Sequence, residues 1–78
     1  MPKLPNLTGN QLIRALESVG FVAVRQKGSH VQLRRREPDG QVTTFPVPVH
    51  AGRSLKPGTL KGILRKANLD TEQLLRLL

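Results

Sequence analysis

The sequence lacks cysteine, tryptophan and tyrosine, and Phe21 and Phe45 are its two phenylalanines. The absence of cysteine excludes disulfides, thiol chemistry and thiolate metal sites. No apolar run approaches the roughly 20 residues that a membrane-spanning helix needs, and the N-terminal residues lack the apolar region of a signal peptide. With 78 residues, the chain is expected to form one domain, residues 1–78, with a lean core. We therefore expect a small cytoplasmic protein that does not bind membranes.

Acidic residues are also scarce. Five Asp and Glu stand against thirteen Lys and Arg, which gives a formal net charge of +8, and no acid occurs at residues 18–36 or 40–69. This concentrated basic excess favours a polyanionic partner, because binding releases counterions from phosphates. A nucleic acid or an acidic protein is favoured over a merely solvated surface. A membrane-surface helix is disfavoured, because the cations are spread over predicted strands as well as helices.

The first predicted element is a helix over residues 9–19. Thr8 can cap its start, with Gln11 three residues later as in a capping box. Apolar residues then recur at helical spacing, and Gly20 can adopt the left-handed conformation that ends a helix.

Three strands are predicted next, over residues 21–27, 30–36 and 41–49. The two residues Gly28 and Ser29 predict a tight hairpin turn, and Glu-Pro-Asp-Gly at residues 37–40 predicts a second turn. Proline cannot donate to a strand ladder, so Pro46 and Pro48 predict that the third strand is an edge strand or leaves the sheet early.

A loop over residues 50–58 precedes a second helix, whose predicted buried stripe is Leu60, Ile63, Leu64 and Ala67. Asp70, with Gln73 three residues later, predicts a short last helix rich in leucine. That tail either packs across the helices or meets a partner chain. The predicted fold is α+β, in the order α-β-β-β-α with a short C-terminal helix. A three-stranded antiparallel sheet would carry the helices on one face, which is the layout of the double-stranded RNA-binding domain.

His30 is the residue best suited to chemistry. In a strand over residues 30–36 it points away from Val31 and Leu33, with Lys27 and Arg34 nearby in sequence. A histidine can accept and donate a proton near neutral pH, and RNA supplies its own nucleophile, the 2′-hydroxyl. A base together with cations that stabilise a charged phosphorane would suffice for cleavage without a metal. The residues alone leave open whether His30 is such a base or an ordinary surface histidine.

Other candidate residues carry weaker signals. His50 is a candidate second proton carrier, phosphate contact or cap of loop backbone, and two histidines without a close carboxylate do not make a metal site. Gly28 forms a turn and can let a phosphate approach the backbone. The start of the second helix, flanked by Arg53 and Lys56, is either a phosphate site or an ordinary helix start.

Taken together, these segments resemble the HicA toxin family, also called YcfA-like. The resemblance rests on Gly-Ser-His at residues 28–30, Val-Pro-Val-His at residues 47–50, and LKPGTLKGILRKA at residues 55–67. The run LTGNQLIRAL at residues 7–16, followed by Gly20 and Phe21, is similar to that family too. Two departures are the very basic Arg34-Arg35-Arg36 and Asn68, which stands where a glycine often follows the second helix.

The resemblance implies a fold like the double-stranded RNA-binding domain and an mRNA interferase, the toxin of a type II toxin–antitoxin module. Such proteins cleave RNA without a metal or other cofactor, stop translation, and are neutralised by the antitoxin HicB, which covers the active face. The histidine of the Gly-Ser-His motif, here His30, would carry the activity. The predicted RNA-binding residues are Arg25, Lys27, Gly28, Ser29, Arg34, Arg53 and Lys56, with His50 as candidate second proton carrier. The alternatives are a non-catalytic basic RNA-binding module and a subunit that binds only an acidic protein.

Overall fold

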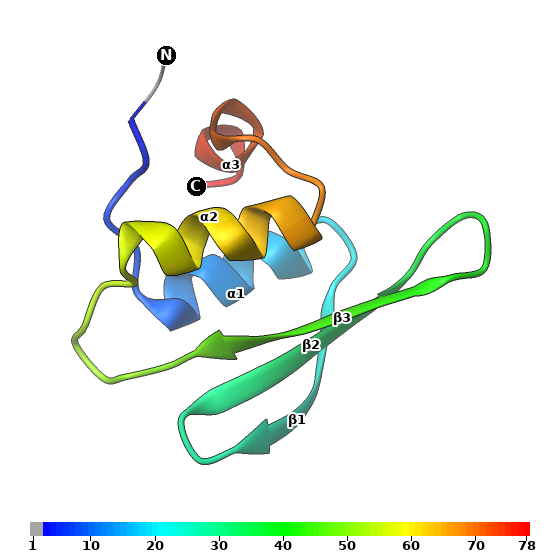
Figure 1. The fold of residues 1–78 in the computed structure, drawn as a ribbon, viewed down its shortest axis with the longest axis horizontal. Helices are drawn as coiled ribbons and strands as arrows, with labels where there is room; N and C mark the ends of the chain where they lie inside the picture. The colour runs from blue at the N-terminus through cyan, green and yellow to red at the C-terminus, as the bar shows by residue number, and fades with distance from the viewer. Residues whose placement is uncertain (1–2) are drawn as a thin grey trace.

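The computed structural model describes residues 3–78, so the first two residues of the predicted domain lie outside the described residues. Figure 1 shows the order of elements, which confirms the predicted α+β fold. The helices and strands are α1 (Gly9–Glu17), β1 (Val22–Lys27), β2 (His30–Arg36), β3 (Val42–Pro48), α2 (Pro57–Lys66) and α3 (Thr71–Leu77).

Polar caps begin two of the helices as predicted. Thr8 accepts from the backbone N–H of Gln11, and the Gln11 side chain accepts from the backbone N–H of Thr8. Asp70 and Gln73 make the same reciprocal pair at α3. Helix α1 ends at Glu17 rather than at the predicted residue 19, because the chain turns there and Gly20 takes a left-handed φ of 99°.

The sheet is antiparallel, in the order β1-β2-β3. Strand β3 is therefore an edge strand, as its prolines predicted. The backbone N–H of Val49 donates to the carbonyl of Ser29. Since hydrogen-bonded pairs alternate along an antiparallel ladder, the nitrogens of Pro46 and Pro48 face away from β2, where no donor is needed.

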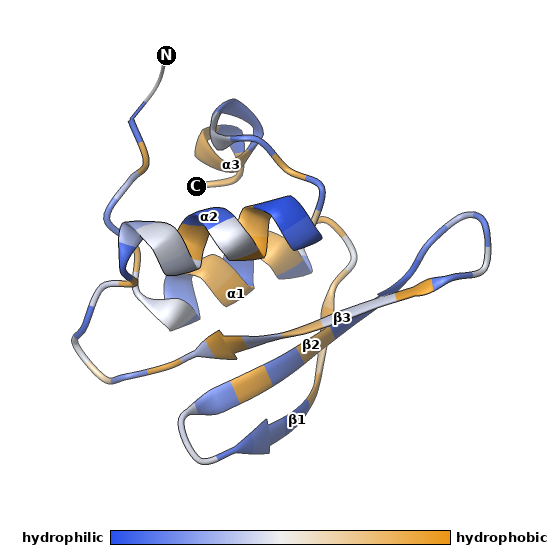
Figure 2. Ribbon diagram, viewed as in Figure 1, coloured by the Kyte–Doolittle hydropathy of each residue, from blue (hydrophilic) through white to orange (hydrophobic). Residues whose placement is uncertain are grey.

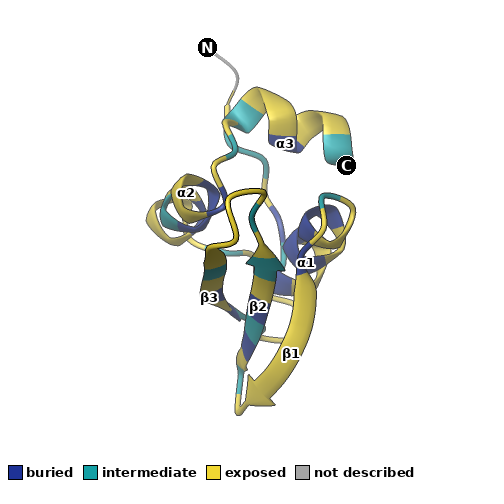
Figure 3. Ribbon diagram, turned by 90° about the vertical axis from the view of Figure 1, so that its right-hand side faces the viewer, coloured by how far each residue is buried: buried dark blue, intermediate teal, exposed yellow. Residues whose placement is uncertain are grey.

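One face of the sheet carries the core. Helices α1 and α2 lie over this face, and α3 lies beyond them (Figures 1 and 3). Hydrophobic and hydrophilic residues alternate along β2 (Figure 2). Val31 and Leu33 are accordingly buried, while His30 and Arg34 are exposed. Leu74 of α3 is fully buried, whereas Leu75 of α3 and Leu78 just after it stay exposed. The leucine-rich tail thus packs onto the helices through part of its apolar surface.

A close backbone approach joins α1 to the end of β3. A Cβ atom built on Gly9 would lie 2.0 Å from the carbonyl oxygen of Pro48. Nearby, the backbone N–H of Leu55 donates to the carbonyl of Leu7 at 2.6 Å, and Thr8 forms an isolated bridge with Ser54. These contacts fix the loop that follows β3 against the start of α1.

We expect Gly9→Ala to lower the free energy of unfolding by about 1–3 kcal/mol, because the added methyl group forces backbone apart. Gly62→Ala in α2 is the matched control. Its Cβ would meet nothing within 4 Å, so better helix propensity should stabilise the protein by about 0.5–1 kcal/mol. Urea unfolding of both variants checks the pair, and equal effects would contradict the close approach.

Arg35 lies on the apolar side of β2 and covers the edge of the core. Its guanidinium stacks 4.2 Å from the centre of the Phe21 ring and donates to the carbonyl of Val19 at 3.1 Å. The same group bonds the Glu37 carboxylate at 2.9 Å. These contacts join the β2–β3 hairpin to the turn after α1.

The Arg35 guanidinium, and secondarily a hydrogen bond from Thr43, hold the pKa of the Glu37 carboxyl below its usual range. A lowered folded-state pKa gives stability that is present above the unfolded-state pKa and is lost as pH falls through the folded-state pKa. Glu37→Gln should therefore lower the melting temperature at neutral pH, and the difference should vanish in acid. A Glu37→Gln deficit that persisted unchanged in acid would contradict this assignment.

Candidate functional site

The sheet face opposite the helices, here called the open face, carries exposed residues from all three strands, while its residues Gln32 and Pro48 are half-buried. Figure 3 shows that β1 is exposed along its whole length. Residues directly opposite one another on neighbouring strands share a face. His30 pairs with Lys27 of β1 and with Pro48 of β3, so these three residues lie together on the open face. The imidazole of His30 is therefore exposed, as the sequence predicted.

A β-bulge in β1 brings the cations of that strand to His30. Ala23 pairs with Leu33, but Arg25 pairs with Gln32, so Val24 is an extra residue in the ladder. In a regular strand, Arg25 would share the inward side with Phe21 and Ala23. The extra residue reverses this alternation, and both Arg25 and Lys27 consequently lie on the open face.

Two hollows meet at His30. The hairpin hollow is lined by Arg25, Lys27, His30 and Gln32. The loop hollow lies on the other side of the same imidazole. Its lining residues are His30, Pro48, His50, Arg53, Ser54, Leu55, Lys56 and Thr59.

Backbone hydrogen bonds set the wall of the loop hollow. Val49 donates to Ser29 in the β1–β2 turn at 2.6 Å, and Arg53 donates to His50 at 3.0 Å. Together with the bonds of Leu55 and Ser54 to the start of α1, these contacts hold His50 and the following cations beside β2. Residues far apart in the sequence thus line one hollow with His30.

Most of the predicted site residues are brought together. Arg25 and Lys27 line the hairpin hollow, whereas His50, Arg53 and Lys56 line the loop hollow. Gly28, with φ 59°, and Ser29 form the turn that precedes His30. Arg34 lies further along the open face, opposite Val22 and Thr44, and lines neither hollow.

Sequence reasoning gave no role to Gln32 and Thr59, which also line the hollows. Gln32 carries a sequence signal, because it lies two residues from His30 and so faces the same side of β2. Thr59 carries no comparable signal, since it reaches the loop hollow only through the packing of α2.

The electrostatics of the two hollows are uniformly basic. Among residues 3–78, no carboxylate lines either hollow. The ion pair between Arg35 and Glu37 lies outside both hollows, at the end of β2. In the same described residues no group of three or more His, Asp or Glu side chains is arranged to hold a metal ion. The site therefore offers two imidazoles and several unneutralised cations, which suits a phosphate-containing ligand.

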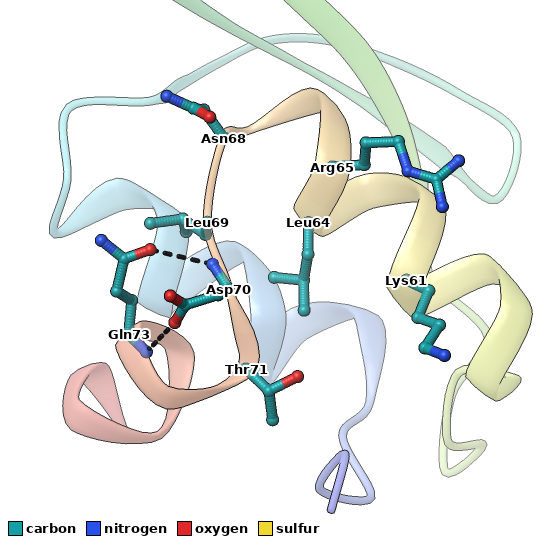
Figure 4. A pocket seen from close by; sticks show the side chains of 8 residues that line it. All are labelled: Lys61, Leu64, Arg65, Asn68, Leu69, Asp70, Thr71 and Gln73. Carbon is teal, nitrogen blue, oxygen red and sulfur yellow. Dashed lines mark hydrogen bonds between the residues drawn. The ribbon is translucent and has the colours of Figure 1, made fainter. Parts of the chain in front are cut away.

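A further hollow lies between α2 and α3 (Figure 4), lined by Lys61, Leu64, Arg65, Asn68, Leu69, Asp70, Thr71 and Gln73. Its polar groups Asp70 and Gln73 bond each other's backbone in the cap of α3. These groups are occupied by helix capping, and the hollow lies on the helical side of the molecule. It contains neither histidine.

Comparison with protein families identifies a match over most of the chain. The family model described as HicA toxin of bacterial toxin-antitoxin matches residues 9–69, a segment that includes both histidines and both hollows. A comparison with curated proteins gives no match. Among residues 3–78, no helix combines the length and the apolar character needed to cross a membrane.

Proposed function

Because the chain belongs to the HicA toxin family, we propose that it is a metal-independent endoribonuclease that cleaves mRNA and thereby inhibits translation. We further propose that a HicB-type antitoxin neutralises it and that it acts in the cytoplasm, where mRNA is found. Membership of the family makes the protein a toxin of a toxin–antitoxin system. The observation that supports the nuclease is the exposed His30 imidazole between two hollows lined by cations.

The proposed reaction begins with the ribose 2′-hydroxyl of the RNA. One nitrogen of the His30 imidazole accepts its proton, and the oxygen attacks the adjacent phosphorus. This step needs a base in reach of the ribose, which is why exposure of His30 supports the proposal. The RNA carries the nucleophile, so no protein nucleophile is required.

The second step breaks the bond between phosphorus and the 5′-oxygen. The bonding electrons leave with that oxygen, which accepts a proton from His50 or from water. The products are a 2′,3′-cyclic phosphate and a 5′-hydroxyl. Arg25 and Lys27 on one side, and Arg53 and Lys56 on the other, stabilise the negative charge of the phosphorane between them.

The same open face is the proposed surface for the antitoxin. A protein of net charge +8 attracts an acidic partner over long range. Exposed Val22, Val24 and Val42 on the sheet strands add apolar area to the basic surface. An acidic antitoxin bound there would exclude RNA from His30.

We expect His30→Ala to reduce RNA cleavage at least about 100-fold, since loss of a general base costs about 10²–10⁴ in rate. The side chain is exposed, so the free energy of unfolding should change by no more than about 0.5 kcal/mol. Cleavage of labelled RNA in EDTA, followed on a denaturing gel, makes the comparison.

His50→Ala is the matched control, because it removes the other imidazole of the loop hollow. It should reduce cleavage less than His30→Ala if water can replace the second proton carrier. Equal toxicity and equal cleavage by wild type and His30→Ala would rule out the catalytic role. RNA binding by wild type without any product would instead support the non-catalytic RNA-binding alternative.

Arg25→Ala and Lys27→Ala should each weaken RNA binding and flatten its salt dependence. Each lost phosphate contact should reduce the slope of log K against log salt by about 0.7 for single-stranded RNA. Arg76→Ala, an exposed cation on α3, is the control that should leave the slope unchanged. Fluorescence anisotropy over a salt series provides the slopes. Unchanged slopes for both β1 variants would show that the hairpin hollow does not hold phosphate.

A further inference from the structure

The open face has no Phe, Tyr or Trp side chain on which a base could stack. The chain contains no Tyr or Trp, and Phe21 and Phe45 are both buried, with ring centres 5.1 Å apart in the core. Stacking on these rings, a usual way of holding an unpaired base, is therefore not supplied by this protein, and stacking on an imidazole or a guanidinium does not distinguish one base from another. Discrimination between bases must rely on hydrogen bonds from side chains near His30.

Gln32 is the neutral polar side chain that lines the hairpin hollow with His30. Its Nε2 lies 2.9 Å from the hydroxyl oxygen of Thr44, and that hydroxyl donates its proton to the carbonyl of Leu33 at 3.0 Å. A hydroxyl has one proton to give. Thr44 can therefore only accept from Gln32, and this fixes which end of the amide faces β3.

The fixed amide leaves its carbonyl oxygen, Oε1, as a free acceptor on a side chain that lines the same hollow as the histidine. Within the part of the chain that the structure describes, no protein donor binds Oε1 of Gln32, so both of its lone pairs are available. Arg25 and Lys27, in the same hollow, carry positive charges on flexible side chains, and both suit the phosphate of any nucleotide. Contacts to phosphate position a nucleic acid, whereas contacts to base edges specify its sequence.

We propose that Gln32 is a specificity-determining residue that accepts a hydrogen bond from the exocyclic amino group of the base held in the hairpin hollow. This inference rests on the proposed function. Adenine, cytosine and guanine each carry such a group. Uracil has a single N–H flanked by two carbonyl oxygens, which oppose an acceptor. The protein should therefore disfavour uracil in this position. Thr44 is the positioning residue, because its hydroxyl fixes the orientation of the Gln32 amide.

The test measures binding to short 2′-O-methyl oligonucleotides, which lack the 2′-hydroxyl and so stay intact in the proposed reaction. One oligonucleotide contains adenine, a second contains purine, which is adenine without its amino group, and a third contains uracil. The wild type should bind the adenine oligonucleotide about three- to tenfold more tightly than the purine one, as expected for one neutral hydrogen bond. Gln32→Leu should abolish the difference.

Gln26→Leu is the matched control. Gln26 belongs to the same hairpin but pairs with Val31, so it faces away from His30, and its loss should leave the preference for adenine intact. Thr44→Val should weaken the preference, and Thr44→Ser, which keeps the hydroxyl, should restore it. Melting temperatures of all variants separate this effect from a loss of structure.

Equal binding of adenine and purine by the wild type would overturn the proposal, as would a preference that survives Gln32→Leu. Loss of the preference in Gln26→Leu as well would also overturn it, since the effect would then belong to the hairpin as a whole. Failure of the proposed nuclease activity is measured separately, by cleavage of RNA that has its 2′-hydroxyl groups. A protein that prefers the amino-bearing base but cleaves no 2′-hydroxyl RNA would retain the role of Gln32 and lose the proposed reaction.

Discussion

The candidate site depends on one extra residue in β1. Phe21 must be buried at one end of this strand, and the two-residue turn fixes Lys27 opposite His30 at the other. A regular strand cannot satisfy both, because Phe21 and Lys27 would then face the same side. The bulge at Val24 resolves the conflict, and it brings Arg25 and Lys27 to the face that carries His30. Without it, the strand could not both bury Phe21 and keep Arg25 and Lys27 on the face of His30.

Contacts on the inner side of the sheet hold its strands, and the loop that follows β3, in position. Gly9 lets α1 approach the end of β3, and the bond from Val49 to Ser29 ties the loop after β3 to the hairpin turn. Arg35, stacked on Phe21 and paired with Glu37, fixes the far end of β2 and β3. Packing and backbone contacts thus serve the inner face, while unneutralised cations and the His30 imidazole occupy the outer one.

Local sequence signals predicted much of this arrangement. Caps, turns, the edge strand and the exposure of His30 follow from neighbouring residues, and each is confirmed. The bulge could not be read from local pattern, because it appears only when alternation counted from Phe21 is compared with alternation counted from the Gly28-Ser29 turn. The loop hollow depends on long-range backbone bonds to Leu7 and Thr8. The role of Gln32 needs the hydroxyl of Thr44, which only strand register brings near.

The most direct test of the central claim is chemical-shift mapping by NMR with an uncleavable 2′-O-methyl RNA. Our account predicts that the largest changes fall on Arg25, Lys27, His30 and Gln32, with further changes at the loop hollow. Gln26, on the same strand but the other side, should change little. Changes centred on α2 and α3, with the resonances of His30 and its neighbours unmoved, would contradict the account.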